Sequence, residues 1–165
     1  MWVQNCIRRS FAIIRNSVSE WTELGGRLLV VFDGHCGLCN RAVRWFLRRD
    51  RRDTLRFAPS EMPRVAKLLV RLGVVANEAG AEPGSIVVVR GAESERPDVL
   101  LRSDALAAML KELPQPWPLW SGVLRVIPRA VRDVGYRLIA RWRYRIWGRL
   151  EACPVPAAEE RGRFL

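Results

Sequence analysis

The chain has 165 residues and a formal net charge of +11, from 28 lysines and arginines against 17 acidic residues. This length suits one domain, and a domain of this size buries about 70% of the surface that its unfolded chain exposes, so it can build a core without disulfides. The positive balance suits an anionic partner, but the arginines are spread along helical segments and no recognised nucleic-acid motif accompanies them. We therefore expect solvated basic helix faces rather than nucleic-acid binding.

The cysteines and the apolar runs bear on the cellular setting. Four cysteines, of which only two are closely spaced, do not make a disulfide framework, so a reducing, cytoplasmic setting is predicted. No apolar run approaches the ~20 residues that cross a bilayer, and Arg8, Arg9 and Arg15 interrupt any signal-peptide core. We expect a protein that does not span the membrane, and peripheral contact with a membrane surface stays open.

Residues 1–26 are predicted to form an amphipathic N-terminal extension. Apolar residues recur there at mostly helical spacing, with arginines between them. This segment could pack on the domain, fray from it, or lie on a membrane surface, and the first two are favoured. Cys6 belongs to this segment and is interpreted as an ordinary small apolar residue.

The stretch 28–40 carries the strongest motif of the chain. An apolar run predicts a strand at 28–32, the next two residues a turn, and residues 37–50 a helix with an apolar stripe. Cys36 and Cys39 form a C-x-x-C pair where that helix starts, and in this context the pair is a candidate for redox chemistry. Helix N-termini favour thiolates, so we expect Cys36 to be exposed and reactive, with Cys39 one turn further on and shielded.

The elements that follow complete a domain predicted at 27–113. They are a strand at 54–58, a helix at 61–72, a hairpin of strands at 85–90 and 98–102, and a helix at 103–113. Ser60 and Ser103 are expected to cap the two helices, and Gly73 to end the first of them. The order β-α-β-α-β-β-α is that of the thioredoxin core, and its first half implies a parallel crossover.

Residues 114–165 are predicted to form a stiff proline-rich connector and two basic helices, at 119–126 and 128–147, packed on the domain. One side of the longer helix carries six apolar residues: Val131, Val134, Leu138, Ile139, Trp142 and Ile146. The other side carries four arginines: Arg132, Arg137, Arg141 and Arg145. Docking of this helix on the domain is the first expectation, and binding to a membrane surface is the alternative.

Several spaced motifs together resemble the DCC family of thioredoxin-like thiol-disulfide oxidoreductases, whose letters stand for one Asp and two Cys residues. Asp33, Cys36 and Cys39 match those three positions. Further matching blocks are Arg102-Ser103-Asp104-Ala105, Ile127-Pro128, Asp133, Tyr136, Arg143-Tyr144-Arg145, Gly148 and Cys153-Pro154. The resemblance runs from about residue 28 to the C-terminus. It implies an α/β, thioredoxin-like three-layer fold with a four-stranded mixed sheet and a C-terminal helical extension.

The motif also suggests a mechanism. Cys36 would attack a disulfide of a protein or small-molecule substrate as a thiolate, and Cys39 would resolve the mixed disulfide. His35, the one histidine of the chain, would either favour the thiolate as an imidazolium or face solvent as a turn residue. Asp33 is expected to shape the turn, with an auxiliary acid-base role toward Cys39 left open.

Other residues leave alternatives around this site. Thioredoxins place a cis-proline opposite the C-x-x-C, and the nearest candidate, Pro83, is offset from the third strand. Cys153 could act as a relay with Cys36 or be an idle thiol. A zinc site would need Cys6, Cys153 or His35 at no recognisable spacing, so neither a metal nor a cofactor is expected.

Two functions from different classes remain in view. The first is a thiol-disulfide oxidoreductase. The second is a non-catalytic thioredoxin-like binding module that uses the basic C-terminal helices at a membrane surface or protein partner, with incidental cysteines.

Overall fold

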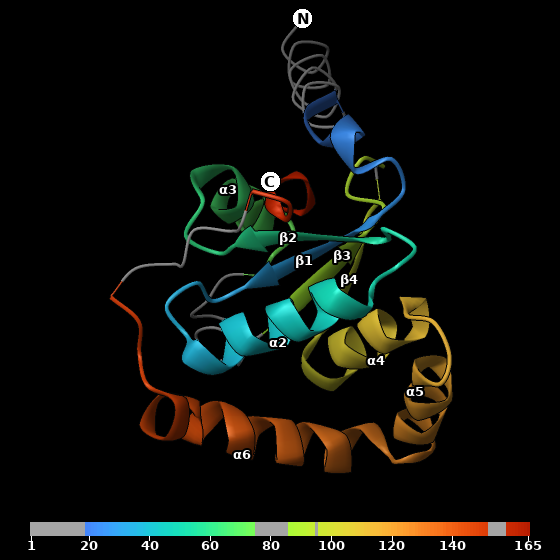
Figure 1. Ribbon diagram of the computed structural model, residues 1–165, viewed down its shortest axis with the longest axis vertical. Helices are drawn as coiled ribbons and strands as arrows, with labels where there is room; N and C mark the ends of the chain where they lie inside the picture. The colour runs from blue at the N-terminus through green and yellow to red at the C-terminus, as the bar shows by residue number, and fades with distance from the viewer. Residues whose placement is uncertain (1–18, 75–85, 95, 152–157) are drawn as a thin grey trace, which may run out of the picture.

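The computed structural model describes residues 19–74, 86–94, 96–151 and 158–165, and its centre is a four-stranded mixed sheet in the order β2-β1-β3-β4 (Figure 1). Strand β1 (Leu28–Phe32) pairs parallel with β2 (Leu55–Pro59) and antiparallel with β3 (Val87–Arg90). Strand β4 (Asp98–Leu101) pairs antiparallel with β3. The expected mixed sheet of four strands is confirmed.

Helices cover both faces of this sheet. Helices α2 (Gly37–Arg49) and α4 (Arg102–Glu112) lie on one face, whereas α3 (Pro63–Arg71) and the 3-10 helix η1 (Ser19–Leu24) lie on the other (Figure 1). The side chains of β1 alternate between the two layers, so each face has its own apolar core. This α/β arrangement is consistent with a thioredoxin-like fold.

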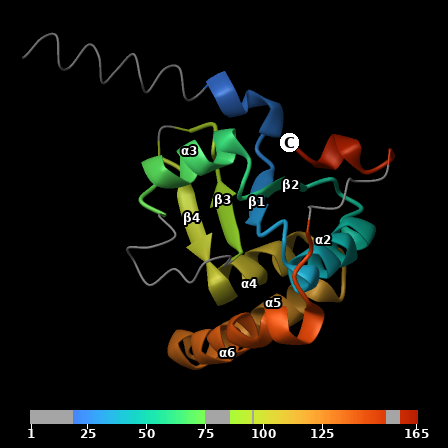
Figure 2. The same cartoon turned by 90° about the vertical axis from the view of Figure 1, so that its left-hand side faces the viewer.

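Two further helices lie outside the α2–α4 layer. Helix α5 (Trp117–Val126) packs on α4, and α6 (Arg129–Trp147) crosses beneath α2 and α4 (Figures 1 and 2). The C-terminal segment returns to β2 through the short helix η2 (Arg161–Arg163), and the Phe164 ring packs at the sheet against Phe57. The connector expected before α5 is shorter than predicted, because α5 already begins at Trp117.

The two predicted serine caps are wrong. Helix α3 begins after Met62 with no side-chain cap, and the Ser60 N–H donates instead to the Phe32 carbonyl oxygen at 2.8 Å. Helix α4 begins one residue before Ser103, and the Ser103 hydroxyl donates to the carboxylate of Asp133 on α6. A serine hydroxyl that bonds to another element does not cap the helix in which it stands. Ser103 therefore ties α6 to the domain.

Helix α6 docks through its polar side. Ala140 and Arg143 are buried against the domain, whereas the six apolar residues of the opposite side are 42–62% exposed. Polar partners explain this orientation: Asp133 bonds to Ser103, and Arg132 forms an ion pair of 2.9 Å with Asp104. Buried polar groups left without such partners would cost free energy. The helix does contact the domain, but its apolar side remains exposed.

Several predictions fall on residues outside the described part of the chain. These are the amphipathic extension before residue 19, Pro83, Cys6 and Cys153. Among the helices of the described segments, none is long and apolar enough to cross a membrane.

Candidate active site

The turn between β1 and α2 is held by side-chain hydrogen bonds at both ends. Asp33 Oδ1 accepts the His35 N–H at 2.9 Å, which closes an Asx turn. The Asn40 amide donates to the carbonyl oxygens of Gly34 at 2.8 Å and Cys36 at 3.0 Å. These bonds place Cys36 at the N-cap of α2, so the expected turn-shaping role of Asp33 is present.

The two thiols lie within one helical turn and are reduced. Cys36 has an extended backbone as the N-cap, and its Sγ accepts the Cys39 N–H at 3.2 Å. Hydrogen bonds from Cys39, helped by the nearby charge of Arg143, lower the pKa of Cys36 to about 6 from an ordinary 9.0 against the opposing effect of burial. The side-chain hydrogen bond with Cys36, together with burial, raises the pKa of Cys39. Chemically, the pair therefore consists of one thiolate and one thiol.

A buried cation and its partners complete the surroundings of the thiols. The guanidinium of Arg143 is 4% exposed and has its Nη2 at 3.6 Å from Asp33 Oδ2. The same nitrogen lies 3.2 Å from the Tyr144 hydroxyl, which in turn donates to Asp33 Oδ2. Burial and the hydrogen bond to Asp33 raise the pKa of Tyr144, so this hydroxyl keeps its proton. Asp33, Arg143 and Tyr144 thus form a charged cluster next to the cysteines.

Cys36 is buried, contrary to the expectation that it would be exposed. Its exposed fraction is 0%, and that of Cys39 is 4%. The chain that leaves α6 covers the pair: Arg149 forms an antiparallel bridge with Cys36, and the Gly37 N–H donates to the Gly148 carbonyl oxygen at 3.3 Å. We call residues 147–150 the strap. The argument from helix position failed because it could not include a segment more than a hundred residues away.

Gly37 is what allows the strap to lie this close. A Cβ atom at this position would stand 2.3 Å from the Trp147 carbonyl oxygen, and contacts below 3.0 Å are essentially never seen. Only glycine therefore fits beneath the strap at the first residue of α2.

His35 is held by the strap as well. Its carbonyl oxygen accepts the Leu150 N–H at 2.8 Å, and its ring Nδ1 lies 3.1 Å from the Leu150 carbonyl oxygen. A carbonyl can only accept, so Nδ1 must carry a proton to make this bond. The positive charge that lowers the pKa of Cys36 comes from Arg143, which is a role that sequence reasoning had offered to His35.

Arg143 and Tyr144 are the residues that sequence reasoning missed. They lie more than a hundred positions after Asp33, and helical spacing alone marks Arg143 as one of many arginines on a basic helix. The signal that could have found them is their place in the Arg143-Tyr144-Arg145 block of the family resemblance.

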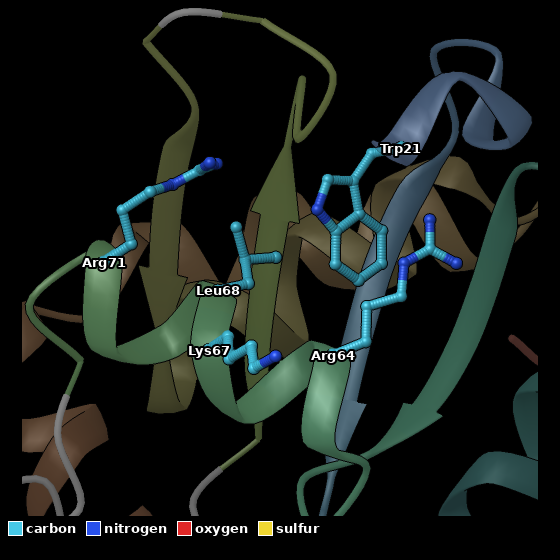
Figure 3. Close-up of a pocket in the computed structure, with 5 residues that line it drawn as sticks. All are labelled: Trp21, Arg64, Lys67, Leu68 and Arg71. Carbon is cyan, nitrogen blue, oxygen red and sulfur yellow. The ribbon is translucent and has the colours of Figure 1, made fainter. Parts of the chain in front are cut away.

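Other candidate sites lie apart from the thiols. No three His, Cys, Asp or Glu side chains gather as metal ligands within the described segments. A cavity of about 90 Å³ lies between η1 and α3, on the sheet face opposite α2, and is lined by Trp21, Arg64, Lys67, Leu68 and Arg71 (Figure 3). Its Arg64 stacks on the Trp21 ring at 4.1 Å and pairs with Glu23 at 2.6 Å. This cavity therefore does not adjoin the cysteines.

Comparisons with known proteins place the chain in a family. The family model of the DCC1-like thiol-disulfide oxidoreductases matches residues 30–149. The chain is 31% identical to a chloroplastic DCC family protein of Arabidopsis thaliana, over 92% of this chain and 83% of that protein. It is 28% identical to the uncharacterized protein YuxK of Bacillus subtilis, over 83% of this chain and 93% of that protein. No solved structure matches.

Proposed function

Because the chain belongs to the DCC1-like thiol-disulfide oxidoreductase family, we propose that it exchanges disulfides with thiol substrates through Cys36 and Cys39. The observation that carries the proposal is the hydrogen bond from the Cys39 N–H to Cys36 Sγ, with the opposite pKa shifts of the two thiols. Exchange needs one thiol ready as a nucleophile and a second held back as a thiol, and this pair has that asymmetry.

The proposed reaction proceeds through a mixed disulfide. The Cys36 thiolate attacks one sulfur of a substrate disulfide, and the other substrate sulfur leaves as a thiolate. Cys39 then loses its proton and attacks Cys36 Sγ, which forms the Cys36–Cys39 disulfide and releases the second substrate thiolate. Two electrons pass from the dithiol to the substrate, and the reverse sequence oxidises a substrate dithiol. The proposed substrates are the disulfides, and in the reverse direction the thiols, of proteins or of low-molecular-weight compounds.

The charged cluster has a defined part in this scheme. Arg143 stabilises the Cys36 thiolate, whereas the carboxylate of Asp33 opposes it. Asp33 also acts on Cys39, where it raises the pKa, and we assign it the proton that Cys39 releases in the resolving step. Tyr144 orients the carboxylate by donating to Oδ2. Stabilising the thiolate favours the reduced pair, so the couple is expected to be more oxidising than an unperturbed dithiol.

The strap adds a requirement. Cys36 Sγ must approach the substrate along the axis of the S–S bond that breaks. The buried thiol offers no such approach while residues 147–150 cover it. In the proposed cycle the strap therefore moves away before the mixed disulfide forms.

The competing function is a non-catalytic binding module with incidental cysteines. Such a module has no need for a thiolate at Cys36 or for a buried arginine beside it. The exchange reaction uses both, and a reducing compartment such as the cytoplasm would keep the pair available for it.

Trapping the mixed disulfide tests the proposal. In a chain that carries Cys6→Ser and Cys153→Ser, the further change Cys39→Ser should leave a stable Cys36–glutathione adduct after incubation with oxidised glutathione. The matched Cys36→Ser variant should form far less adduct, because Cys39 is only 4% exposed and its burial disfavours the thiolate. Equal adduct in both variants, measured by intact mass, would remove the assignment of Cys36 as the nucleophile.

A further inference from the structure

The exposed large apolar side chains of the described part of the chain are concentrated on two consecutive helices, α5 and α6. Apart from Val70 on α3, every well-exposed large apolar side chain there lies on α5, on α6 or at Ile127, which joins them. The contribution of α5 and its end is Leu119, Trp120, Val123, Val126 and Ile127, with exposed fractions of 38–85%. Large exposed apolar patches are rare on monomers and mark interaction sites, so this concentration of exposed apolar side chains calls for an explanation.

The solvent-exposed side of α6 carries a regular stripe of apolar residues. Val131, Val134, Leu138, Trp142 and Ile146 follow one another at steps of three and four residues, so they share one helix face. The opposite face is the one occupied by the domain, through Arg132 and Arg143, which are 9% and 4% exposed. Figures 1 and 2 show α6 along the outer edge of the molecule, with no other described segment beyond it.

The accessible charges on α5 and α6 themselves are all positive, although Arg129 already pairs with Asp104 of α4 at 3.0 Å. Between residues 117 and 150 the single acidic residue is Asp133, which is 14% exposed and already bonded to Ser103. The exposed arginines of that segment are Arg125, Arg129, Arg137, Arg141, Arg145 and Arg149. An apolar face beside cationic side chains, without accessible carboxylates, suits an anionic lipid surface.

We propose that α5 and α6 form a docking surface for the anionic headgroup region of a lipid bilayer. The apolar stripe enters the boundary between headgroups and acyl chains, and the arginines contact lipid phosphates. Trp120 and Trp142 are 56% and 42% exposed, and tryptophan is a residue type that prefers this boundary. The helices lie on the membrane, because none of the described helices is long and apolar enough to cross it.

Charge decides between a membrane and a second copy of the chain. An isologous dimer through this face would bring the arginines of both copies together, and no accessible carboxylate on α5 or α6 would pair with them. Lipid phosphates neutralise the same arginines. The proposal does not depend on the cysteines, so it stands or falls separately from disulfide exchange.

Vesicle co-sedimentation of the full-length reduced chain tests the surface. Vesicles of phosphatidylcholine mixed with phosphatidylglycerol should bind the chain about tenfold or more tightly than vesicles of phosphatidylcholine alone, and added salt should weaken this binding. The change Val134→Ser with Leu138→Ser should reduce the binding by a similar factor. Val70→Ser is the matched control, since Val70 is 63% exposed but lies on α3, and it should bind as the unchanged chain does.

Each other outcome overturns the proposal. Absence of binding does so directly, and binding that Val134→Ser with Leu138→Ser leaves intact would place the lipid contact elsewhere, for example before residue 19. Sedimentation velocity is run in parallel. A dimer that dissociates in the Val134→Ser, Leu138→Ser variant would assign this face to a second copy instead. The glutathione redox equilibrium of that variant should be unchanged, which shows that its fold and thiols are intact.

Discussion

At the scale of single residues, the reactivity of Cys36 depends on opposing influences. Hydrogen bonds from Cys39 and the charge of Arg143 lower its pKa, while burial and the charge of Asp33 raise it. With a pKa of about 6, roughly nine in ten Cys36 side chains are thiolates at pH 7. This ratio is what separates a working nucleophile from an ordinary buried cysteine.

Removing the cation should make Cys36 a weaker acid. In the Cys6→Ser, Cys153→Ser background, the ultraviolet absorbance of the thiolate should titrate with a midpoint of about 6 in the unchanged site, and Arg143→Gln should raise that midpoint. Arg143→Lys is the control, because it keeps a positive charge, and it should retain most of the shift. A midpoint that stays the same in Arg143→Gln would show that the hydrogen bonds from Cys39 act alone.

Asp33 can be tested without disturbing the turn. In Asp33→Asn the amide oxygen can still accept the His35 N–H, so the Asx turn remains while the negative charge is lost. The midpoint of Cys36 should then fall, since the carboxylate had raised its pKa. The resolving attack by Cys39 should slow by about a hundredfold or more, because its proton acceptor is gone. Stopped-flow release of glutathione from the mixed disulfide measures this step, and an unchanged rate would exclude Asp33 as that acceptor.

At the scale of elements, the strap lies against the buried Cys36, so we expect it to limit access to this thiol. Gly37→Ala would place a methyl group 2.3 Å from the Trp147 carbonyl oxygen, so the strap must shift. We expect iodoacetamide to modify Cys36 about tenfold faster or more in this variant, and unfolding by urea to show a loss of about 1–3 kcal/mol from the overpacked contact.

Gly135→Ala is the matched control for that substitution. Gly135 is an exposed residue in the interior of α6, where a Cβ atom would have nothing within 4 Å, so alanine should stabilise the helix by about 0.5–1 kcal/mol and leave the modification rate unchanged. Faster modification in both variants would mean that general loosening, rather than the strap, exposes Cys36.

The elements also show how far a sequence can be interpreted. Strand β1 and helices α2 and α6 were predicted to within one residue, because apolar periodicity and the terminal glycine of α6 are local signals. The face by which α6 docks was not predictable in this way. Its orientation depends on contacts with α4: Asp133 accepts a hydrogen bond from Ser103, and Arg132 forms an ion pair with Asp104.

At the scale of the whole molecule, the candidate active site is built from two distant segments. The C-x-x-C pair and Asp33 follow β1, and their position at the start of α2 was predictable from residue type and spacing. Arg143 and the strap belong to the C-terminal end of α6 and the residues after it. The burial of Cys36 and the positive charge that lowers its pKa therefore could not be predicted from local sequence pattern. Folding brings these parts together through tertiary contacts that no window of sequence contains.

The shifted pKa of Cys36 also links the site to global stability. Its pKa is lowered from 9.0 in the unfolded chain to about 6 in the folded one, so its contribution is complete above pH 9 and is lost as the pH falls through about 6. Urea unfolding of the reduced chain should therefore show a gain on the order of 1–2 kcal/mol between pH 6 and pH 8. Cys36→Ser should lack this gain. The same pH dependence in both chains would contradict the lowered pKa.

The equilibrium of the Cys36–Cys39 pair with glutathione decides whether the two cysteines form a redox couple. The Cys6→Ser, Cys153→Ser chain is incubated in buffers of graded ratios of reduced to oxidised glutathione, quenched with acid, alkylated and weighed by mass spectrometry. We expect a reversible two-electron transition between the dithiol and the intramolecular disulfide, with a reduction potential that becomes more negative in Arg143→Gln because the thiolate loses its cation. If the two cysteines remain reduced at every ratio, or form only adducts with glutathione, the chain is not a dithiol-disulfide oxidoreductase.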